Sequence, residues 1–162
     1  MTRTVAYLES PLGLLKLVGI AQSLCSLSFV AKEDEDEILS ENLTPVIRQL
    51  NEYFAGNRQQ FVLSIHMEGT HFQRNVWEEL MKIPFARICC YEDIARSLGD
   101  IKVIRAAATA NGRNPLPIIV PCHRVIGKDG SLTGYSGGLW RKKWLLDFEQ
   151  KELQPKIGFE NS

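Results

Sequence analysis

The apolar pattern changes its period near residue 70, and this change limits the folds that the chain can adopt. Apolar residues alternate in short stretches before residue 66 and recur at helical spacing after residue 70. Alternation predicts half-buried strands, whereas spacing of three and four predicts amphipathic helices. A chain of 162 residues fits one domain, or a small domain joined to a larger one. We therefore expect an α+β fold, in which a small N-terminal antiparallel sheet with a helix precedes a mostly helical C-terminal part.

The N-terminal region contains three clear strand patterns and one helix pattern. The strand patterns are Val5–Leu8, Leu14–Val18 and Leu24–Val30, with a turn at residues 10–13 and a further alternating stretch at Phe61–Ile65. Thr44 is an expected N-cap, Pro45 fits the first helical position, and Gly56 lies past the end of this helix. Its core-facing stripe consists of Val46, Leu50, Tyr53 and Phe54. Residues 31–42 are acidic and indicate a loop or a frayed helix start.

The C-terminal region begins with a helix and continues with two shorter ones. Thr70 and Gln73 have the spacing of a capping box, and Pro84 should stop the helix that follows. Its apolar face consists of Phe72, Val76, Leu80 and Ile83. A second helix is expected from Tyr91 to Leu98 with Gly99 as its cap, and a third from Lys102 to Ala110. Two short helices joined by a glycine turn are typical of a helix-turn-helix.

Small residues and positive charge mark the region around the third helix. Residues 105–110 have almost no bulk apart from Arg105, so this helix can press close to a surface such as a DNA groove. Tight packing between helices, with a solvated Arg105, explains the same pattern.

The formal charge is −4 for residues 1–69, +6 for residues 70–144 and −2 for residues 145–162. A basic segment between acidic ends is expected if one face meets phosphates, although a solvated face has the same composition.

Cys122 is the candidate nucleophile. The apolar residues 118–120 predict a buried strand that brings Cys122 to a turn next to His123. A thiol is a strong nucleophile only as thiolate, and a histidine or a positive charge lowers its pKa, which makes His123 and Arg124 candidate activators. Glu149 lies on the closing helix, where Trp140, Trp144 and Phe148 are expected to face inward, and could orient the imidazole. The alternative is a buried thiol beside a capping histidine.

Other functional classes have less support in the sequence. The cysteines at positions 25, 89, 90 and 122 match no zinc-finger spacing, so we expect neither a metal nor another cofactor. No apolar run approaches the ~20 residues of a membrane span. The N-terminus lacks the apolar region of a signal peptide, so we expect a cytoplasmic protein without membrane association.

Three neighbouring stretches in the second half of the chain read NGRNP at 111–115, IVPCHRVIG at 119–127 and LTGYSGGL at 132–139. With them, residues 71–149 closely resemble the O6-alkylguanine-DNA alkyltransferases, the methylated-DNA–protein-cysteine methyltransferases, and residues 119–127 match the active-site motif of that family. The resemblance implies a ribonuclease H-like domain at residues 1–69 and a DNA-binding, alkyl-accepting domain at residues 70–162. Departures from the family pattern are Cys90, Ala108 and Trp140.

The resemblance also implies a reaction and a set of site residues. The alkyl group of O6-methylguanine in double-stranded DNA, and also of O4-methylthymine, would move irreversibly to Cys122, in a monomer that flips the base from the minor groove. His123 would act as base through a water and Glu149 would orient it, while Asn114 would hold the loop and Tyr91 would donate a hydrogen bond to the purine. The residues implied to contact DNA or line the pocket are Arg105, Ala106, Thr109, Arg113, Tyr135 and Ser136.

The sequence argues against three other functions. A non-catalytic alkyl-lesion binder of the same scaffold would lack the cysteine, which is present as Cys122. A helix-turn-helix regulator would need base-reading residues on the third helix, which is rich in alanine. A cysteine hydrolase would need another arrangement of His and Glu around its nucleophile.

Overall fold

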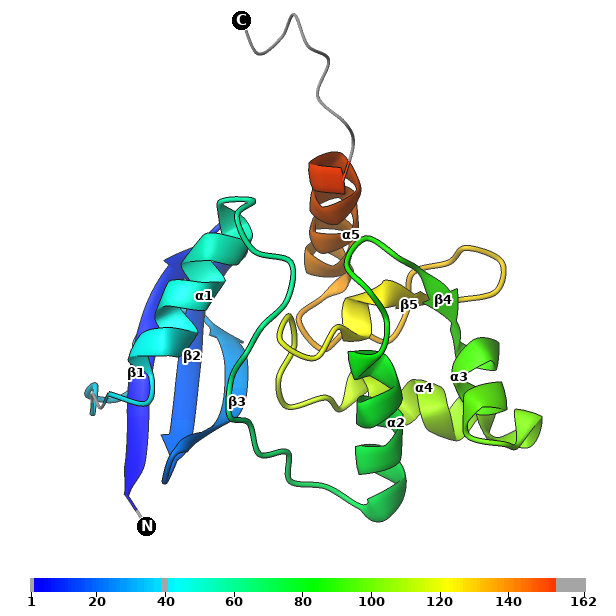
Figure 1. Ribbon diagram of the computed structural model, residues 1–162, viewed down its shortest axis with the longest axis horizontal. Coiled ribbons are helices and arrows are strands. Elements are labelled where there is room, and N and C mark those ends of the chain that lie inside the picture. The colour runs from blue at the N-terminus through cyan, green and yellow to red at the C-terminus, as the bar shows by residue number, and fades with distance from the viewer. Residues whose placement is uncertain (1, 39–40, 154–162) are drawn as a thin grey trace, which may run out of the picture.

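A computed structural model describes residues 2–38 and 41–153 of the chain. Its elements form a three-stranded sheet with one helix on its face, followed by a group of helices on the other side of the molecule (Figure 1). This is the expected α+β fold, with the sheet first and the helices after it. Within residues 2–38 and 41–153, no helix has the length and apolar content to cross a membrane.

The three strands pair in sequence order as an antiparallel meander. They are β1 (Arg3–Ser10), β2 (Gly13–Ile20) and β3 (Ser23–Val30). The first turn needs a left-handed residue, which Gly13 supplies at φ +100°, and the Ser10 hydroxyl donates to the Gly13 carbonyl at 2.7 Å. Alternate residues such as Leu15 and Leu17 are fully buried, as the period of two predicts.

The helix α1 (Thr44–Phe54) supplies the apolar cover of this sheet. Val46, Leu50 and Tyr53 are buried, as expected, whereas Phe54 is only partly buried. The prediction that Thr44 caps the helix was wrong. Leu43 occupies the cap position instead, with a helical backbone (φ −90°, ψ −18°), and no side-chain hydrogen bond forms there.

The alternating stretch Phe61–Ile65, which could have been another strand, forms no regular strand. The segment makes one parallel bridge, between Leu24 and Ile65. Its side chains alternate in burial, but the Gln49 side chain bonds both the N–H and the carbonyl of Val62, at 2.9 and 3.0 Å. An amide side chain therefore takes the hydrogen bonds that a neighbouring strand would have made.

The helix α2 (His71–Met81) starts with the predicted capping box between Thr70 and Gln73. It ends at Met81, three residues before Pro84, with Lys82 as its C-cap. The next helix, α3 (Tyr91–Ser97), ends before Gly99, whose φ of +89° confirms its role as a stop. A 3-10 turn at Ile101–Val103 leads into α4 (Ile104–Gly112), which completes the helix-turn-helix.

Two short strands join the helix-turn-helix to the segment that carries Cys122. These are β4 (Cys89–Cys90) and β5 (Val125–Ile126), which pair in parallel. The pairing holds Tyr91, the first residue of α3, close to the 3-10 turn Cys122–Arg124. The last helix, α5 (Leu139–Leu153), packs against this turn and buries Lys142, Leu145 and Glu149.

Candidate active site

The backbone before Cys122 is a buried turn rather than the strand that the apolar residues 118–120 predicted. Ile118 has a φ of +76°, and the Val120 N–H donates to the Leu116 carbonyl at 2.8 Å. Pro117 and Pro121 flank the turn, and a proline nitrogen cannot donate to a strand ladder. The turn therefore closes on itself and delivers Cys122 to the first position of a 3-10 helix.

Asn114 holds this turn in place. Its side-chain N–H donates to the Val120 carbonyl at 2.8 Å, and its oxygen accepts from the Leu116 N–H at 2.9 Å. All these groups are buried, so each bond replaces one that water would otherwise make. The Asn114 side chain also lowers the pKa of the Cys122 thiol.

His123 and Glu149 form a buried pair next to Cys122. The His123 Nε2 atom lies 2.8 Å from a carboxylate oxygen of Glu149, and both side chains are almost fully buried. Burial raises the pKa of Glu149, but hydrogen bonds from His123 and Arg124 and the charge of Arg124 outweigh it and leave the pKa well below its usual value. Burial lowers the pKa of His123, so the ring is neutral near pH 7.

These two pKa directions fix the tautomer of His123. An ionised Glu149 can only accept, so the proton of the neutral ring lies on Nε2 and Nδ1 keeps a free lone pair. The Nδ1 atom is buried and finds no hydrogen-bond partner in the part of the chain that the structure describes. His123 therefore has an open acceptor position beside the nucleophile, which a general base requires.

Arg124 does not activate the thiol, contrary to the sequence-based expectation. Its guanidinium donates to both Glu149 oxygens, at 2.8 and 2.9 Å, and to the Ile83 carbonyl at 2.7 Å. Tyr53 from α1 donates to Glu149 at 2.5 Å, and the Ala86 N–H donates at 3.1 Å. Glu149 therefore accepts from four residues and connects the N-terminal helix to the turn that carries Cys122.

The thiol of Cys122 is held as a neutral group. Only 3% of the residue is exposed, and burial raises the pKa of Cys122 to about 11, although Asn114 and the charge of Lys142 lower it. The expectation that neighbouring groups lower this pKa below that of a free thiol was wrong, because loss of hydration exceeds their effect. Cys122 becomes a thiolate only when a base accepts its proton.

Tyr91, Tyr135 and Lys142 also lie close enough to Cys122 to influence it electrostatically. The Tyr91 hydroxyl donates to the Thr133 carbonyl at 2.9 Å, and the Lys142 amine donates to the same carbonyl at 2.7 Å. Lys142 also donates to the Val125 carbonyl, and its Nζ lies 3.5 Å from the Tyr91 oxygen. Burial raises the pKa of Tyr135 well above its usual value, and its hydroxyl has no partner among the described residues.

Lys142 is the site residue that the sequence reasoning missed. It is fully buried, and burial lowers the pKa of its amine to about 8, although the nearby Cys122 raises it. The expected inward stripe on α5 consisted of aromatic residues, but Trp140 is 54% exposed. The buried positions are 142, 145 and 149, which recur at helical spacing. A lysine inside that stripe was the only signal that the sequence offered.

Apart from Tyr135, the residues expected to contact DNA or line the pocket lie outside this buried cluster. Arg105, Ala106, Thr109 and Arg113 are exposed on one side of α4 and at its end, whereas Ala107, Ala110 and Asn111 are buried. Ser136 is exposed in the loop that holds Tyr135. Buried Ala110 accepts a hydrogen bond from the Trp77 ring at 2.9 Å, so small residues on this side serve packing against α2.

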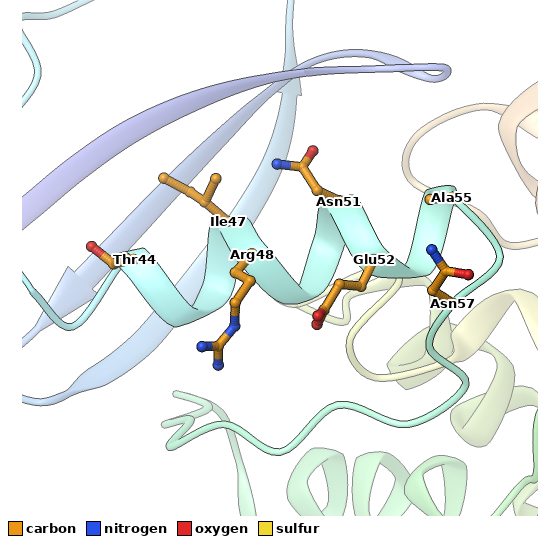
Figure 2. A pocket seen from close by; sticks show the side chains of 7 residues that line it. All are labelled: Thr44, Ile47, Arg48, Asn51, Glu52, Ala55 and Asn57. Carbon is orange, nitrogen blue, oxygen red and sulfur yellow. The ribbon is translucent and has the colours of Figure 1, made fainter.

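A separate hollow lies along α1. Figure 2 shows that its lining comes from that helix and the residues just after it: Thr44, Ile47, Arg48, Asn51, Glu52, Ala55 and Asn57. None of these residues belongs to the cluster around Cys122. The hollow has no cysteine or histidine in its lining and plays no part in the chemistry described below.

The sequence matches two family models that together cover most of the chain. Residues 4–67 match the ribonuclease-like domain of 6-O-methylguanine DNA methyltransferase, and residues 71–151 match its DNA-binding domain. A curated relative, the methylated-DNA–protein-cysteine methyltransferase of Methanosarcina barkeri, is 41% identical over 91% of this chain and 97% of its own length.

The solved structures that resemble this chain also include methyltransferases of this kind. The O6-methylguanine methyltransferase of Mycobacterium tuberculosis superposes with a TM-score of 0.87 at 36% identity, over 99% of this chain and 100% of that one. The Mycobacterium tuberculosis OGT in complex with DNA superposes with a TM-score of 0.82 at 39% identity, over 90% and 92% of the two chains. On this evidence, the chain belongs to the family of methylated-DNA–protein-cysteine methyltransferases.

Proposed function

We propose that this protein repairs double-stranded DNA by moving the alkyl group of O6-alkylguanine to its own Cys122. The observation that carries the proposal is the free Nδ1 of buried His123, next in the chain to a buried thiol and oriented through Glu149. Membership of the family and the relative with bound DNA support the same reaction.

The reaction begins with a proton transfer. The Cys122 thiol gives its proton to Nδ1 of His123 through a bridging water, and Glu149 stabilises the imidazolium that forms. The thiolate then attacks the alkyl carbon, a carbon–sulfur bond forms, and the bond from that carbon to O6 breaks. Its electron pair stays on the guanine. The product is a thioether that no neighbouring group hydrolyses, so each molecule acts once.

Tyr91 is the donor that we assign to the leaving guanine. The departing base carries negative charge unless a proton or a hydrogen bond reaches the purine, and donors placed at developing charge stabilise a transition state. In the free protein the Tyr91 hydroxyl donates to the Thr133 carbonyl. It would exchange this acceptor for the purine, while Lys142 keeps its bonds to the Thr133 and Val125 carbonyls.

The damaged base has to leave the duplex to reach Cys122. Extrusion of a base costs about a few kcal/mol, and a side chain that fills the gap offsets part of this cost. Arg105 is exposed on α4 and has the planar group needed to stack there. Ala106 and Thr109, exposed on the same helix, allow close approach to a minor groove, and Arg113 lies at its end.

The proposal also covers the pocket residues, the substrate range, the oligomeric state and the location of the protein. Tyr135 and Ser136 line the alkyl pocket, and O4-methylthymine is a second substrate. The protein acts as a monomer, because one chain supplies every group assigned to the reaction. Cytoplasmic location fits free cysteines at positions 25, 89, 90 and 122, since thiols stay reduced there.

One experiment separates this function from the alternatives. A duplex with radiolabelled O6-methylguanine is incubated with the protein, and the mixture is run on a denaturing gel. We expect label on the protein for the wild type and none for Cys122→Ala, whose DNA binding stays intact because the thiol makes no phosphate contact. A lesion binder or a transcription regulator would retain no label. A hydrolase would release it to solution.

A further inference from the structure

Arg141 joins two segments that are far apart in the sequence. Its Nε donates to the Leu12 carbonyl at 2.9 Å, in the turn between β1 and β2. Its second donor group bonds the Gly137 carbonyl at 2.7 Å, directly after Tyr135 and Ser136. One side chain on α5 therefore ties the N-terminal sheet to the loop that we assign to the alkyl pocket.

Aromatic rings on two sides hold the Arg141 guanidinium in place. Its central carbon lies 4.5 Å from the centre of the Phe29 ring and 4.5 Å from that of Trp140. A planar guanidinium can stack and donate two hydrogen bonds at once, which an ammonium cannot do. The exposed Trp140, which the expected inward stripe did not explain, thus has a role in this stack.

Phe29 also contacts the pocket loop directly. A methyl group built on Gly137 would lie 2.6 Å from the Phe29 ring, so only glycine fits there without a shift. The Phe29 and Tyr135 rings lie 6.3 Å apart between centres. Strand β3 and Arg141 together therefore fix the end of the loop at Gly137.

The beginning of the loop is fixed by a different set of contacts. The Thr133 carbonyl accepts from Tyr91 and Lys142. A methyl group on Gly134 would lie 2.9 Å from the Tyr91 oxygen. Tyr135 and Ser136 thus lie between two fixed points of the loop, Gly134 and Gly137. The Tyr135 side chain is buried next to Cys122.

We infer that Arg141 is a positioning residue that restricts the alkyl pocket to small groups by anchoring its loop to the N-terminal sheet. The inference rests on the proposed function. On this inference, a group larger than methyl would push Tyr135 and Ser136 outward, and this movement would strain or break the bond from Arg141 to Gly137. The N-terminal sheet, which contributes no reacting group, thereby takes part in substrate selection.

The test compares two substrates on the same protein. Single-turnover rates are measured with duplexes that contain O6-methylguanine or O6-benzylguanine at the same position. Effects on folding, DNA binding and base extrusion act on both rates and cancel in their ratio. For Arg141→Met we expect the benzyl-to-methyl ratio to rise about tenfold, which corresponds to ~1.4 kcal/mol. Arg141→Lys keeps the charge but not the planar group, so its ratio should lie between those of Arg141→Met and the wild type.

Lys143→Met is the matched control, since Lys143 lies on the same helix, is exposed and pairs with Asp147. Its ratio should equal that of the wild type. If Arg141→Met does not fold, Phe29→Leu removes one side of the stack and should raise the ratio in the same direction. An unchanged ratio in the folded variant overturns the inference. A wild type that transfers neither group overturns the proposed function instead.

Discussion

The replacement Glu149→Gln tests the centre of the buried network. Five donor groups face the two carboxylate oxygens: the Tyr53 hydroxyl, His123 Nε2, two guanidinium nitrogens of Arg124 and the Ala86 N–H. Glutamine keeps the shape but has one oxygen and one amide nitrogen that donates. In either orientation, at least two of these donors face another donor, and Arg124 loses its counter-charge.

The burial of Glu149 and Arg124 determines how much the free energy of unfolding falls in Glu149→Gln. The side chains of Glu149 and Arg124 are 1% and 7% exposed, so solvent does not screen the loss. Breaking a buried ion pair by removing one partner costs ~3–5 kcal/mol. The free energy of unfolding of a typical domain is ~5–15 kcal/mol, so Glu149→Gln should lose a large share of it.

Urea unfolding at pH 7 measures this loss. Asp147→Asn is the control, because Asp147 pairs with Lys143 on the same helix and both side chains are about two-thirds exposed. It should change the free energy of unfolding by less than ~1 kcal/mol. A Glu149→Gln loss as small as that of the control would refute the buried network.

The rate of alkyl transfer gives an independent measure, taken where Glu149→Gln is still folded. Without an ionised carboxylate, the Nε2 proton of His123 is no longer fixed and the imidazolium is less stable. General-base catalysis contributes ~10²–10⁴-fold, so the transfer rate should fall at least ~100-fold and its pH dependence should move upward. A rate and pH profile like those of the wild type would limit Glu149 to a structural role.

Three further predictions concern acid stability, base extrusion and the pocket loop. The pKa of Glu149 lies below its unfolded value, so its contribution to the free energy of unfolding is complete above about pH 5 and is lost as the pH falls. Urea unfolding between about pH 5 and pH 2 should therefore show a smaller loss for Glu149→Gln than for the wild type, and equal losses would contradict this. Arg105→Ala should slow repair of duplex DNA roughly 30- to 150-fold, because ~2–3 kcal/mol of the compensation for base extrusion is lost. The reaction with free O6-benzylguanine needs no extrusion and should change less than about threefold. Equal slowing of both reactions would mean that Arg105 supports the fold or the pocket. Gly134→Ala brings a methyl group to 2.9 Å from the Tyr91 oxygen, whereas Gly130→Ala has an equally left-handed backbone but meets nothing within 4 Å in the described chain. Both should lose ~1–2 kcal/mol of stability, but only Gly134→Ala should slow transfer, and matching rates would argue against this contact.

The sequence predicted the arrangement of elements because local signals determine it. The three strands follow the alternation of apolar residues, and α2 begins at the capping box of Thr70 and Gln73. Gly99 ends α3 through its left-handed backbone. The motif around Cys122 also led to His123 and Glu149, which lie together as expected. The remaining assigned roles stay predictions until they are measured.

The secondary structure was mispredicted where side chains take the place of backbone hydrogen-bond partners. Gln49 bonds both backbone groups of Val62, so an alternating stretch forms no regular strand. Asn114 bonds the backbone on both sides of the turn at residues 117–121, so a β-branched run is buried without a ladder. Such bonds from side chains to the backbone leave no mark in the local apolar pattern.

The sequence was also misleading about the charge state of two buried groups. Lysine is read as a surface residue, yet Lys142 is buried because backbone carbonyls of Val125 and Thr133 accept from its amine. The pKa of Cys122 depends on how much water folding removes, which the adjacent His123 and Arg124 do not reveal. Both errors concern the hydration of single groups rather than the fold.

The most direct test of the central claim locates the transferred group. The protein is incubated with an excess of duplex that contains O6-methylguanine, digested with a protease, and each cysteine peptide is analysed by tandem mass spectrometry. The account predicts one methyl group per chain, carried on the sulfur of Cys122, with Cys25, Cys89 and Cys90 unmodified. A methyl group on another residue, or continued turnover without modification of Cys122, would contradict it.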